Sequence, residues 1–199
     1  VLVDIFNVKK IIIGYDHRFG KNRAADINDL IAFGQKYNFE VEQISAEEIN
    51  NVSISSTKIR TALQSGNIKL ANEYLGYPYF INGKVVKGKQ LGRTIGYPTA
   101  NIVVSDKCKL IPAIGVYVAY AIINDVKYYG MLNIGTNPTI GDNPITIEMN
   151  IFDFNEDIYE QEIEIGFIDK IRNQQKFNSL DELKLALSKD KEFALNVIK

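Results

Sequence analysis

The stretch IGYPTANI, residues 95–102, places two polar side chains where they could act together. Thr99 and Asn101 lie two positions apart, so on an extended segment both point to the same face. A hydroxyl and an amide oxygen on one face can join the shell of a Mg²⁺ ion that keeps several waters and takes phosphate oxygens from a substrate. The spacing therefore predicts a magnesium and phosphate site at these two residues.

A glycine-rich segment, GKVVKGKQLGRTIG, precedes this site and adds cations to it. Glycines let a phosphate approach the backbone closely, and cations offset its charge. The residues assigned to nucleotide binding, besides Thr99 and Asn101, are Gly83, Lys87, Gly88, Gly92, Arg93, Gly96 and Pro98. A mobile hairpin loop with solvated lysines is the alternative explanation of this composition.

Glu148 is the candidate catalytic base. It lies in ITIEMNIFDF between Ile147 and Met149, and a lone carboxylate on an inward face would be costly without a partner or a function. As a base it could accept the proton of a substrate hydroxyl that attacks a γ-phosphate, while Mg²⁺ and the glycine loop hold the nucleotide. A solvent-facing strand glutamate without a catalytic role is the alternative.

Composition excludes several other chemistries. The 199 residues include 23 basic and 24 acidic side chains, so the net charge gives no reason to expect nucleic acid or an anionic membrane as partner. The single cysteine, Cys108, cannot form an internal disulfide, which suits a reducing cytoplasm. One cysteine and one histidine, His17, cannot build an ordinary zinc site, and a Ser-His-Asp triad would have to use His17. Apolar runs stay well short of the roughly 20 residues that span a bilayer.

The elements that must position these residues fall into two parts with a boundary near residue 76. In 1–76, a strand in KKIIIGYD, a helix over 26–38, a strand in FEVEQIS and two short helices broken at SGN predict an open parallel α/β sheet. From residue 77 the period changes to two, and strands separated by turns such as Asn124–Asp125 predict a small antiparallel barrel. A final helix begins at SLDELKLAL, where Ser179 and Glu182 predict a capping box. The chain begins inside a strand-like run, so we expect that an N-terminal portion is missing.

The motifs resemble those of a known family. The segments GKVVKGKQLGRTIGYPTANI, GVYVAY, YYGMLNIGTNPTIGDNPITIEMNIFDFNEDIY and KIRNQQKFNSLDEL are similar to the riboflavin kinase module of the bacterial bifunctional riboflavin kinase and FAD synthetase. The segments IIIGYDHRFGKNRAADINDL and VSISSTKIRTAL look like the second half of that family's adenylyltransferase domain. The resemblance covers essentially the whole chain.

The resemblance implies a fold and a function for residues 77–199. It implies a six-stranded Greek-key barrel followed by a helix, and ATP- and Mg²⁺-dependent phosphorylation of riboflavin to FMN. Thr99 and Asn101 match residues that bind Mg²⁺ and nucleotide phosphates, and Glu148 matches the base that activates the ribityl 5′-hydroxyl. The segment that closes over the flavin is expected to include Arg172, Phe177 and Leu180, and the turn GTNPTIGDNP is expected to form a second flap.

In residues 1–76 the resemblance implies a partial FMN adenylyltransferase domain. The ISSTKIR motif is expected to bind ATP phosphates at a capped helix N-terminus, through Ser55, Ser56, Thr57 and Arg60. Gly14, Asp16 and Phe19 match a GxDFxFG element in which His17 replaces a phenylalanine. The family's HxGH motif is absent from the sequence. We therefore expect this chain not to synthesise FAD, although a full-length protein should.

Three positions depart from the family pattern, which has glutamate at Gln174, histidine at Asn150 and glycine near Glu160. We expect altered flavin contacts from Gln174 and no loss of chemistry. One rival function is a barrel that binds nucleic acid, but the acidic NEDIYEQEIEIG segment disfavours it. The other rival is an inactive flavin-binding regulator, against which the joint presence of Thr99, Asn101 and Glu148 speaks. No obligate protein partner is evident, so the expected partners are riboflavin, FMN and ATP.

Overall fold

The computed structural model describes residues 2–15, 17–44, 48–49, 52–88, 91–136 and 145–199. They form two compact units, Val1–Ile54 and Ser55–Lys199. Among these residues, no helix combines the length and the apolar character needed to cross a membrane.

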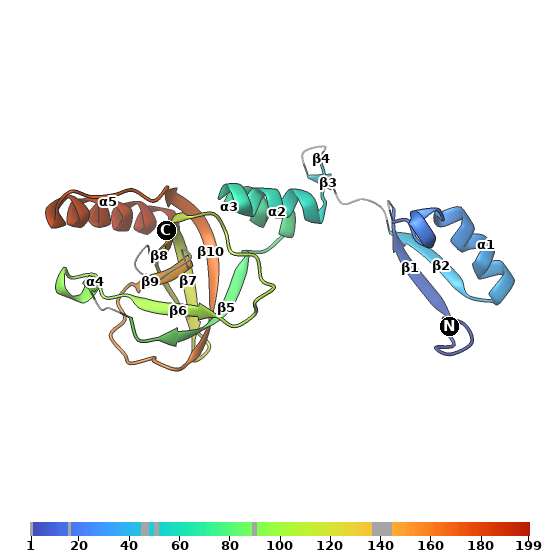
Figure 1. The fold of residues 1–199 in the computed structure, drawn as a ribbon, viewed down its shortest axis with the longest axis horizontal. Coiled ribbons are helices and arrows are strands. Elements are labelled where there is room, and N and C mark those ends of the chain that lie inside the picture. Colours follow the sequence, from blue (N-terminus) through green and yellow to red (C-terminus); the bar gives the residue numbers. More distant parts are fainter. Residues whose placement is uncertain (1, 16, 45–47, 50–51, 89–90, 137–144) are drawn as a thin grey trace. The chain divides into compact units, whose positions relative to one another are not determined.

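The N-terminal unit contains a small parallel α/β motif (Figure 1). Strand β1 (Lys10–Gly14) pairs in parallel with β2 (Glu40–Ile44), and helix α1 (Ile27–Tyr37) connects them. Asp26 caps α1 in a reciprocal box with Asp29, and Asn38 ends the helix in the left-handed conformation. A 3₁₀ turn (Lys21–Arg23) precedes α1, and the short strands β3 (Glu48–Ile49) and β4 (Val52–Ser53) form a separate antiparallel pair. The predicted parallel strand-helix-strand arrangement is confirmed.

The second unit is built around a closed six-stranded antiparallel barrel, in the order β5, β6, β9, β8, β7, β10 (Figure 1). Three consecutive strands form hairpins and the last returns beside the first of them, which is a Greek key. The predicted barrel is therefore confirmed. Its strands are β5 (Phe80–Val86), β6 (Ala100–Val104), β7 (Gly115–Ile123), β8 (Val126–Thr136), β9 (Ile145–Ile151) and β10 (Glu162–Arg172).

Local sequence explains how the barrel closes. Asn124 and Asp125 both have positive φ, at 50° and 64°, as a two-residue type I′ hairpin between right-twisted strands requires. The side chains that fill the interior are apolar and fully buried, among them Ile81, Tyr117, Leu132, Met149, Ile165 and Phe167. Strand β7 is buried on both faces, because helix α5 (Leu180–Ile198) packs against β7, β8 and β10 from outside.

Ser179 caps α5 by accepting a hydrogen bond from the Glu182 backbone N–H at 3.2 Å. The other half of the predicted capping box is different, because the Glu182 carboxylate accepts from the backbone N–H of Asn178 and not from that of Ser179. The helix start was therefore predicted at the correct residue, with one of its two cap bonds.

Two helices that the sequence analysis placed with the first part belong to the compact unit of the barrel. Helices α2 (Ser56–Ser65) and α3 (Ile68–Leu75) break at Gly66 and Asn67, as predicted. They bury Leu63 and Ile68 in the same apolar cluster as the barrel interior. The amide of Asn72 donates to the Phe167 carbonyl at 2.9 Å, and its oxygen accepts from the Tyr79 backbone at 2.7 Å. The functional boundary at residues 76 and 77 stays a prediction.

Candidate active site on the outer face of the barrel

The three central residues of the predicted site lie together at the β6 and β9 strands. Asn101 on β6 is the register partner of Glu148 on β9. The Thr99 hydroxyl, one residue before β6, donates to Glu148 Oε2 at 3.4 Å. Directly paired residues point to the same face of a sheet, so the structure places a hydroxyl, an amide and a carboxylate side by side.

Glu148 lies on the outer face of the barrel and not on the inward face. Its neighbours Ile147 and Met149 are buried in the interior, at 4% and 0% exposure, whereas Glu148 is half-buried on the opposite side of β9. Because strand residues alternate, only one of the two sets could face the core. The carboxylate is neither a buried lone charge nor free in solvent, since Thr99 contacts it.

A fourth residue of this group, Asn133 on β8, was not predicted from the sequence. Asn133 is the register partner of Glu148 on the other side of β9, so the carboxylate lies between two amides. The same register continues from Asn133 to Val116 on β7 and to Arg172 on β10. A lone amide inside the apolar strand YYGMLNIG was the available signal, but periodicity alone does not indicate which residue of another strand it faces.

The glycine loop closes tightly over this group at two positions. A Cβ on Gly88 would lie 2.1 Å from Asn101 Nδ2, and a Cβ on Gly92 would lie 2.2 Å from the Tyr97 carbonyl oxygen. Gly96 has a φ of 86°, in the left-handed region that favours glycine. These three glycines are therefore required by the backbone path around the site.

Gly83 has a different position from the other glycines. It is buried in β5, and a Cβ there would lie 2.4 Å from Ile102 Cγ2, so barrel packing accounts for it. Lys87 is exposed, with its Nζ 5.7 Å from the centroid of the Tyr159 ring. The binding roles of both residues stay predictions.

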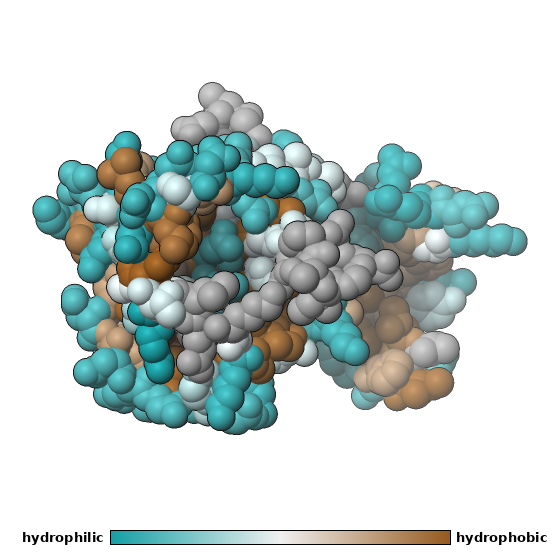
Figure 2. Space-filling model, turned by 60° about the vertical axis from the view of Figure 1, so that its left-hand side comes forward, coloured by the Kyte–Doolittle hydropathy of each residue, from teal (hydrophilic) through white to brown (hydrophobic). Residues whose placement is uncertain are grey.

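A hollow of about 400 Å³ adjoins Thr99. Arg93, Pro98 and Thr99 line one part of it, and the segment 154–159 lines another. A second hollow, of about 440 Å³, is lined by residues 96–98, by residues 150–155 and by Lys191 of α5. The segment 152–159 was not predicted as part of the site, because its acidic residues form no binding pattern of their own. The space-filling view shows a mainly hydrophilic exterior on which apolar residues surface in separate patches (Figure 2).

Asn150 holds the PTAN stretch against β9. Its side-chain amide donates to the Pro98 carbonyl at 2.7 Å. An amide can make this contact where the family pattern has histidine, since both side chains carry an N–H donor. The backbone that presents Thr99 is therefore fixed from the strand that carries Glu148.

The residues expected to contact the flavin differ in burial and in their contacts. Arg172 ends β10 and is ion-paired with Asp190 of α5, and its guanidinium lies 5.5 Å from the centroid of the Phe177 ring. Leu180, the first residue of α5, is 64% exposed. The turn predicted as a second flap falls mostly on residues 137–144, which lie outside the described residues.

The ISSTKIR motif begins α2. Ser55 is the N-cap and accepts a hydrogen bond from the Lys58 backbone N–H at 3.3 Å, as the predicted cap requires. Ser56, Thr57 and Arg60 are exposed on the first turns of this helix. Gly14 ends β1 and Phe19 forms an isolated bridge with Ala25, whereas Asp16 lies outside the described residues. The phosphate-binding role of this motif stays a prediction.

Three tyrosines of strands β7 and β8, namely Tyr117, Tyr120 and Tyr128, serve mainly in packing. Tyr117 is fully buried and donates a hydrogen bond to the Ala113 carbonyl. Burial raises the pKa of Tyr117 from its ordinary value of 10.0 to about 12. Tyr120, also buried, has a pKa raised mainly by burial, and Tyr128 packs edge-on against Phe154.

Comparisons with known proteins agree with the motifs. A family model described as riboflavin kinase matches residues 75–198, and one described as FAD synthetase matches residues 1–58. A bifunctional riboflavin kinase/FMN adenylyltransferase of Haemophilus influenzae is 40% identical over 194 residues, which cover 97% of this chain and 62% of that protein. The corresponding protein of Bacillus subtilis is 38% identical over 194 residues, which cover 95% of this chain and 60% of that protein.

A solved structure described as a macrolide-efflux protein from Streptococcus pneumoniae has a TM-score of 0.84 and 41% identity, over 93% of this chain and 60% of that one. The chain therefore spans about 60% of the length of the proteins that it matches. The predicted resemblance, with a partial adenylyltransferase part, is confirmed.

Proposed function

The chain belongs to the riboflavin kinase family, and from this premise we propose that it transfers the γ-phosphate of ATP to the 5′-hydroxyl of riboflavin, giving FMN and ADP. One observation carries the proposal: Thr99, Asn101 and Glu148 lie side by side beneath the backbone of Gly88. A protein that only binds flavin has no need for a carboxylate base beside a hydroxyl and an amide that suit a metal ion. An inactive flavin-binding barrel remains the alternative that the experiment below tests.

Glu148 acts as the general base in this reaction. Its carboxylate accepts the proton of the ribityl 5′-hydroxyl as that oxygen forms its bond to the γ-phosphorus, and the bond from phosphorus to the β-phosphate oxygen breaks to release ADP. The Thr99 hydroxyl donates a hydrogen bond to the carboxylate, and the register places Asn101 on β6 and Asn133 on β8 beside it. A base that is already oriented by a neighbouring donor needs less reorganisation during proton transfer.

The residues present fit a magnesium ion. Thr99 and Asn101 offer a hydroxyl and an amide oxygen, which are donors that a hard cation accepts, and the Glu148 carboxylate beside them stays available as the base. The close approach of Gly88 leaves backbone beside Asn101 where a side chain would otherwise stand. Mg²⁺ held there would neutralise charge that develops on the transferring phosphate.

We assign the nucleotide to the hollow beside Thr99 and the flavin to the side of Arg172. Arg93 and the exposed Lys87 would offset the charge of the triphosphate. The apolar and aromatic residues of segment 154–159 would contact the adenine ring of ATP. The segment 172–178, which includes Phe177, and Leu180 at the start of α5 would exclude water from the reaction. The same role is predicted for the loop around 136–144, of which residues 137–144 lie outside the described residues.

The division of activities follows the family. We propose that residues 77–199 carry the kinase and that residues 1–76 are part of an FMN adenylyltransferase, so that a protein with the complete domain also converts FMN to FAD. The 199 residues contain His17 as their one histidine and so have no HxGH motif. We expect no AMP transfer to FMN by this polypeptide, and FAD formed from FMN and MgATP would contradict that expectation.

The test is FMN formation from riboflavin and MgATP, comparing the wild-type chain with Glu148→Gln. Glutamine keeps the shape and loses the base, so we expect a fall of about 10²- to 10⁴-fold. Glu164→Gln, on a different strand of the barrel, is the control and should leave the rate within about twofold of wild type. A wild-type chain that binds riboflavin but makes no FMN would favour the inactive flavin-binding alternative.

A further inference from the structure

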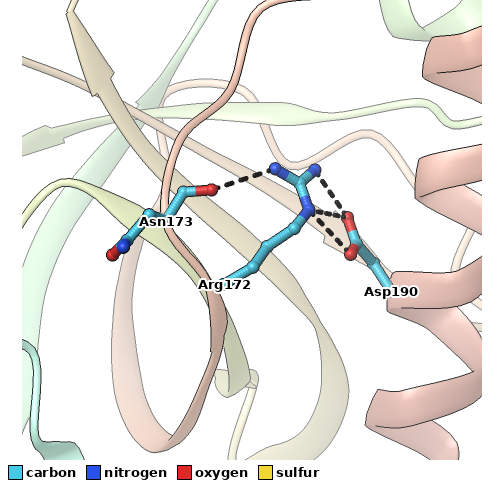
Figure 3. A network of polar contacts seen from close by, with 3 residues as sticks. All are labelled: Arg172, Asn173 and Asp190. Atoms are coloured by element: carbon cyan, nitrogen blue, oxygen red, sulfur yellow. Dashed lines mark hydrogen bonds and ion pairs between the residues drawn. The ribbon is translucent and has the colours of Figure 1, made fainter.

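A buried ion pair joins the end of β10 to the middle of α5 (Figure 3). Arg172 Nε donates to both carboxylate oxygens of Asp190, at 2.9 and 3.1 Å, and Arg172 Nη2 donates to Asp190 Oδ2 at 2.8 Å. Asp190 is 3% exposed, which makes it one of the most buried charged residues that the structure describes. The fork-like geometry fixes the plane of the guanidinium as well as its position.

Stability alone is a weak reason for such a pair. Removing two charges from water costs about as much as their attraction returns, and buried pairs can often be replaced by apolar residues without loss. Geometric definition is the property that a buried, two-pronged pair supplies and an apolar contact does not. The pair therefore serves to fix the position and orientation of the Arg172 guanidinium.

Arg172 holds the segment that follows it. Its Nη1 donates to the Asn173 carbonyl at 3.2 Å, and its Cζ lies 5.5 Å from the centroid of the Phe177 ring. In Figure 3 the guanidinium lies between Asn173 on one side and Asp190 on the other. One planar group thus ties both ends of the 173–177 stretch to α5.

The same segment borders the catalytic group. A Cβ built on Gly135 would lie 3.1 Å from Gln174 Nε2 and 3.1 Å from Asn133 Nδ2, so both amides come to the same place over β8. Asn133 is the register partner of Glu148. Contacts therefore run from Asp190 through Arg172 to the segment that lies beside Asn133.

We propose that Asp190 is a positioning residue for the flavin side of the site. It acts through Arg172 to hold segment 173–178 beside Asn133 and Glu148, so that this side of the riboflavin site is already formed before riboflavin binds. The proposal rests on the proposed kinase function, and it assigns to Asp190 no contact with either substrate. It predicts a selective effect on riboflavin, because none of the contacts that the structure describes for the pair reaches Thr99, Gly88 or the hollow that we assign to ATP.

The experiment measures kcat and the two KM values of Asp190→Asn, with riboflavin binding followed separately by quenching of its fluorescence. We expect the KM and the dissociation constant for riboflavin to rise about tenfold, with kcat and the KM for ATP within about threefold of wild type. The matched control is Glu192→Gln on the exposed side of α5, which should change none of these values by more than about twofold.

A double-mutant cycle separates positioning from general support of the fold. In an Arg172→Met background, Asp190→Asn should raise the riboflavin KM by less than about twofold further, because Arg172 no longer transmits its effect. The urea midpoint of unfolding is measured for each variant. The double variant Arg172→Met/Asp190→Leu removes both charges, so we expect it to recover the wild-type midpoint but not the wild-type affinity for riboflavin.

Three outcomes overturn the proposal: equal losses toward ATP and riboflavin, an unchanged effect in the Arg172→Met background, or recovery of riboflavin affinity together with the midpoint. Failure of the kinase function gives a different result, because the wild-type chain would then make no FMN. The fluorescence titration would still show whether Asp190 controls riboflavin binding in that case.

Discussion

The two compact units differ in how many of their strand edges are paired with a neighbouring strand of the same unit. Every strand of the barrel has a partner on both sides, and its interior is filled by fully buried apolar residues. In the N-terminal unit, β1 and β2 pair only with each other among the described residues. Ile13 and Leu30 are buried there, but Ile12 and Ile44 are 58% and 54% exposed.

This difference bears on where function can be expected. Parallel sheets in proteins are normally covered on both faces, and a two-stranded sheet is marginal by itself. The barrel meets neither difficulty, and it carries all four residues that the proposed phosphoryl transfer uses around Glu148. We therefore expect kinase activity to depend on the packing of the barrel and to be nearly indifferent to that of the N-terminal unit.

The largest expected effect comes from opening a cavity in each unit. Leu132→Ala removes a fully buried side chain from the barrel interior and should lower the free energy of unfolding by about 2–5 kcal/mol, with loss of FMN formation on mild heating. Leu30→Ala does the same in the N-terminal unit and should leave FMN formation within about twofold. Urea unfolding and the kinase assay check both variants, and equal losses of activity would contradict the expectation that FMN formation depends mainly on the packing of the barrel.

A pH titration of unfolding stability should reveal the buried Tyr117 of the barrel. The pKa of Tyr117 is about 12 in the folded protein against 10.0 ordinarily, so the unfolded chain loses this proton first as the pH rises. Stability from this group is therefore complete below about pH 10 and declines by roughly 2–3 kcal/mol toward pH 12. Tyr117→Phe should remove this part of the alkaline slope of unfolding stability. Tyr79, Tyr120, Lys84 and Lys10, whose pKa values are also raised, contribute to the slope that remains. An identical slope in the variant would show that Tyr117 is not its source.

Two glycine-to-alanine changes test close packing around the site, because each adds a methyl group and alters no polar side chain. Gly88→Ala would place a Cβ 2.1 Å from Asn101 Nδ2, and displacement of that amide should lower FMN formation about tenfold. Gly34→Ala in α1 would place a Cβ 2.7 Å from the Phe39 carbonyl oxygen and is the matched change in the other unit. Steady-state kinetics should separate the two variants, and a Gly88→Ala chain with normal activity would exclude close approach as the reason for this glycine.

The smallest effect concerns backbone conformation. Glu160 has a φ of 66° where the family pattern has glycine nearby, and its ion pair with Lys84, at 2.7 Å, is exposed. Glu160→Gly should relieve the left-handed strain and raise the free energy of unfolding by up to about 1 kcal/mol. Asn38→Gly at the end of α1 should gain less, because asparagine tolerates φ near 59°. A destabilised Glu160→Gly variant would mean that the pair with Lys84 matters more than the strain.

Local patterns predicted most of the fold. The period-two strands, the Asn124–Asp125 turn and the helix break at Gly66 and Asn67 each depend on neighbours in sequence, and each was found. The pairing of Thr99 and Asn101 with Glu148 was expected from motif resemblance. Three features needed the folded chain, namely the outer position of Glu148, the amide of Asn133 beside it and the buried Asp190. Alternation fixes which residues share a face, but register between distant strands, and a helix that covers the outside of the barrel, are tertiary facts.

The hydrogen bonds of α2 and α3 determine at which residue this chain can be joined to part of a related protein in a chimaera. Asn72 joins α3 to Tyr79 and Phe167, and the Ala113 backbone N–H donates to the Leu63 carbonyl of α2 at 3.0 Å. A chimaera joined after residue 54 would keep these bonds together, whereas one joined after residue 76 would take α2 and α3 from a different parent than the barrel beneath them. The Ser55 cap at the start of the ISSTKIR motif is thus inherited with the barrel, and exchange of catalytic modules is constrained by this shared support.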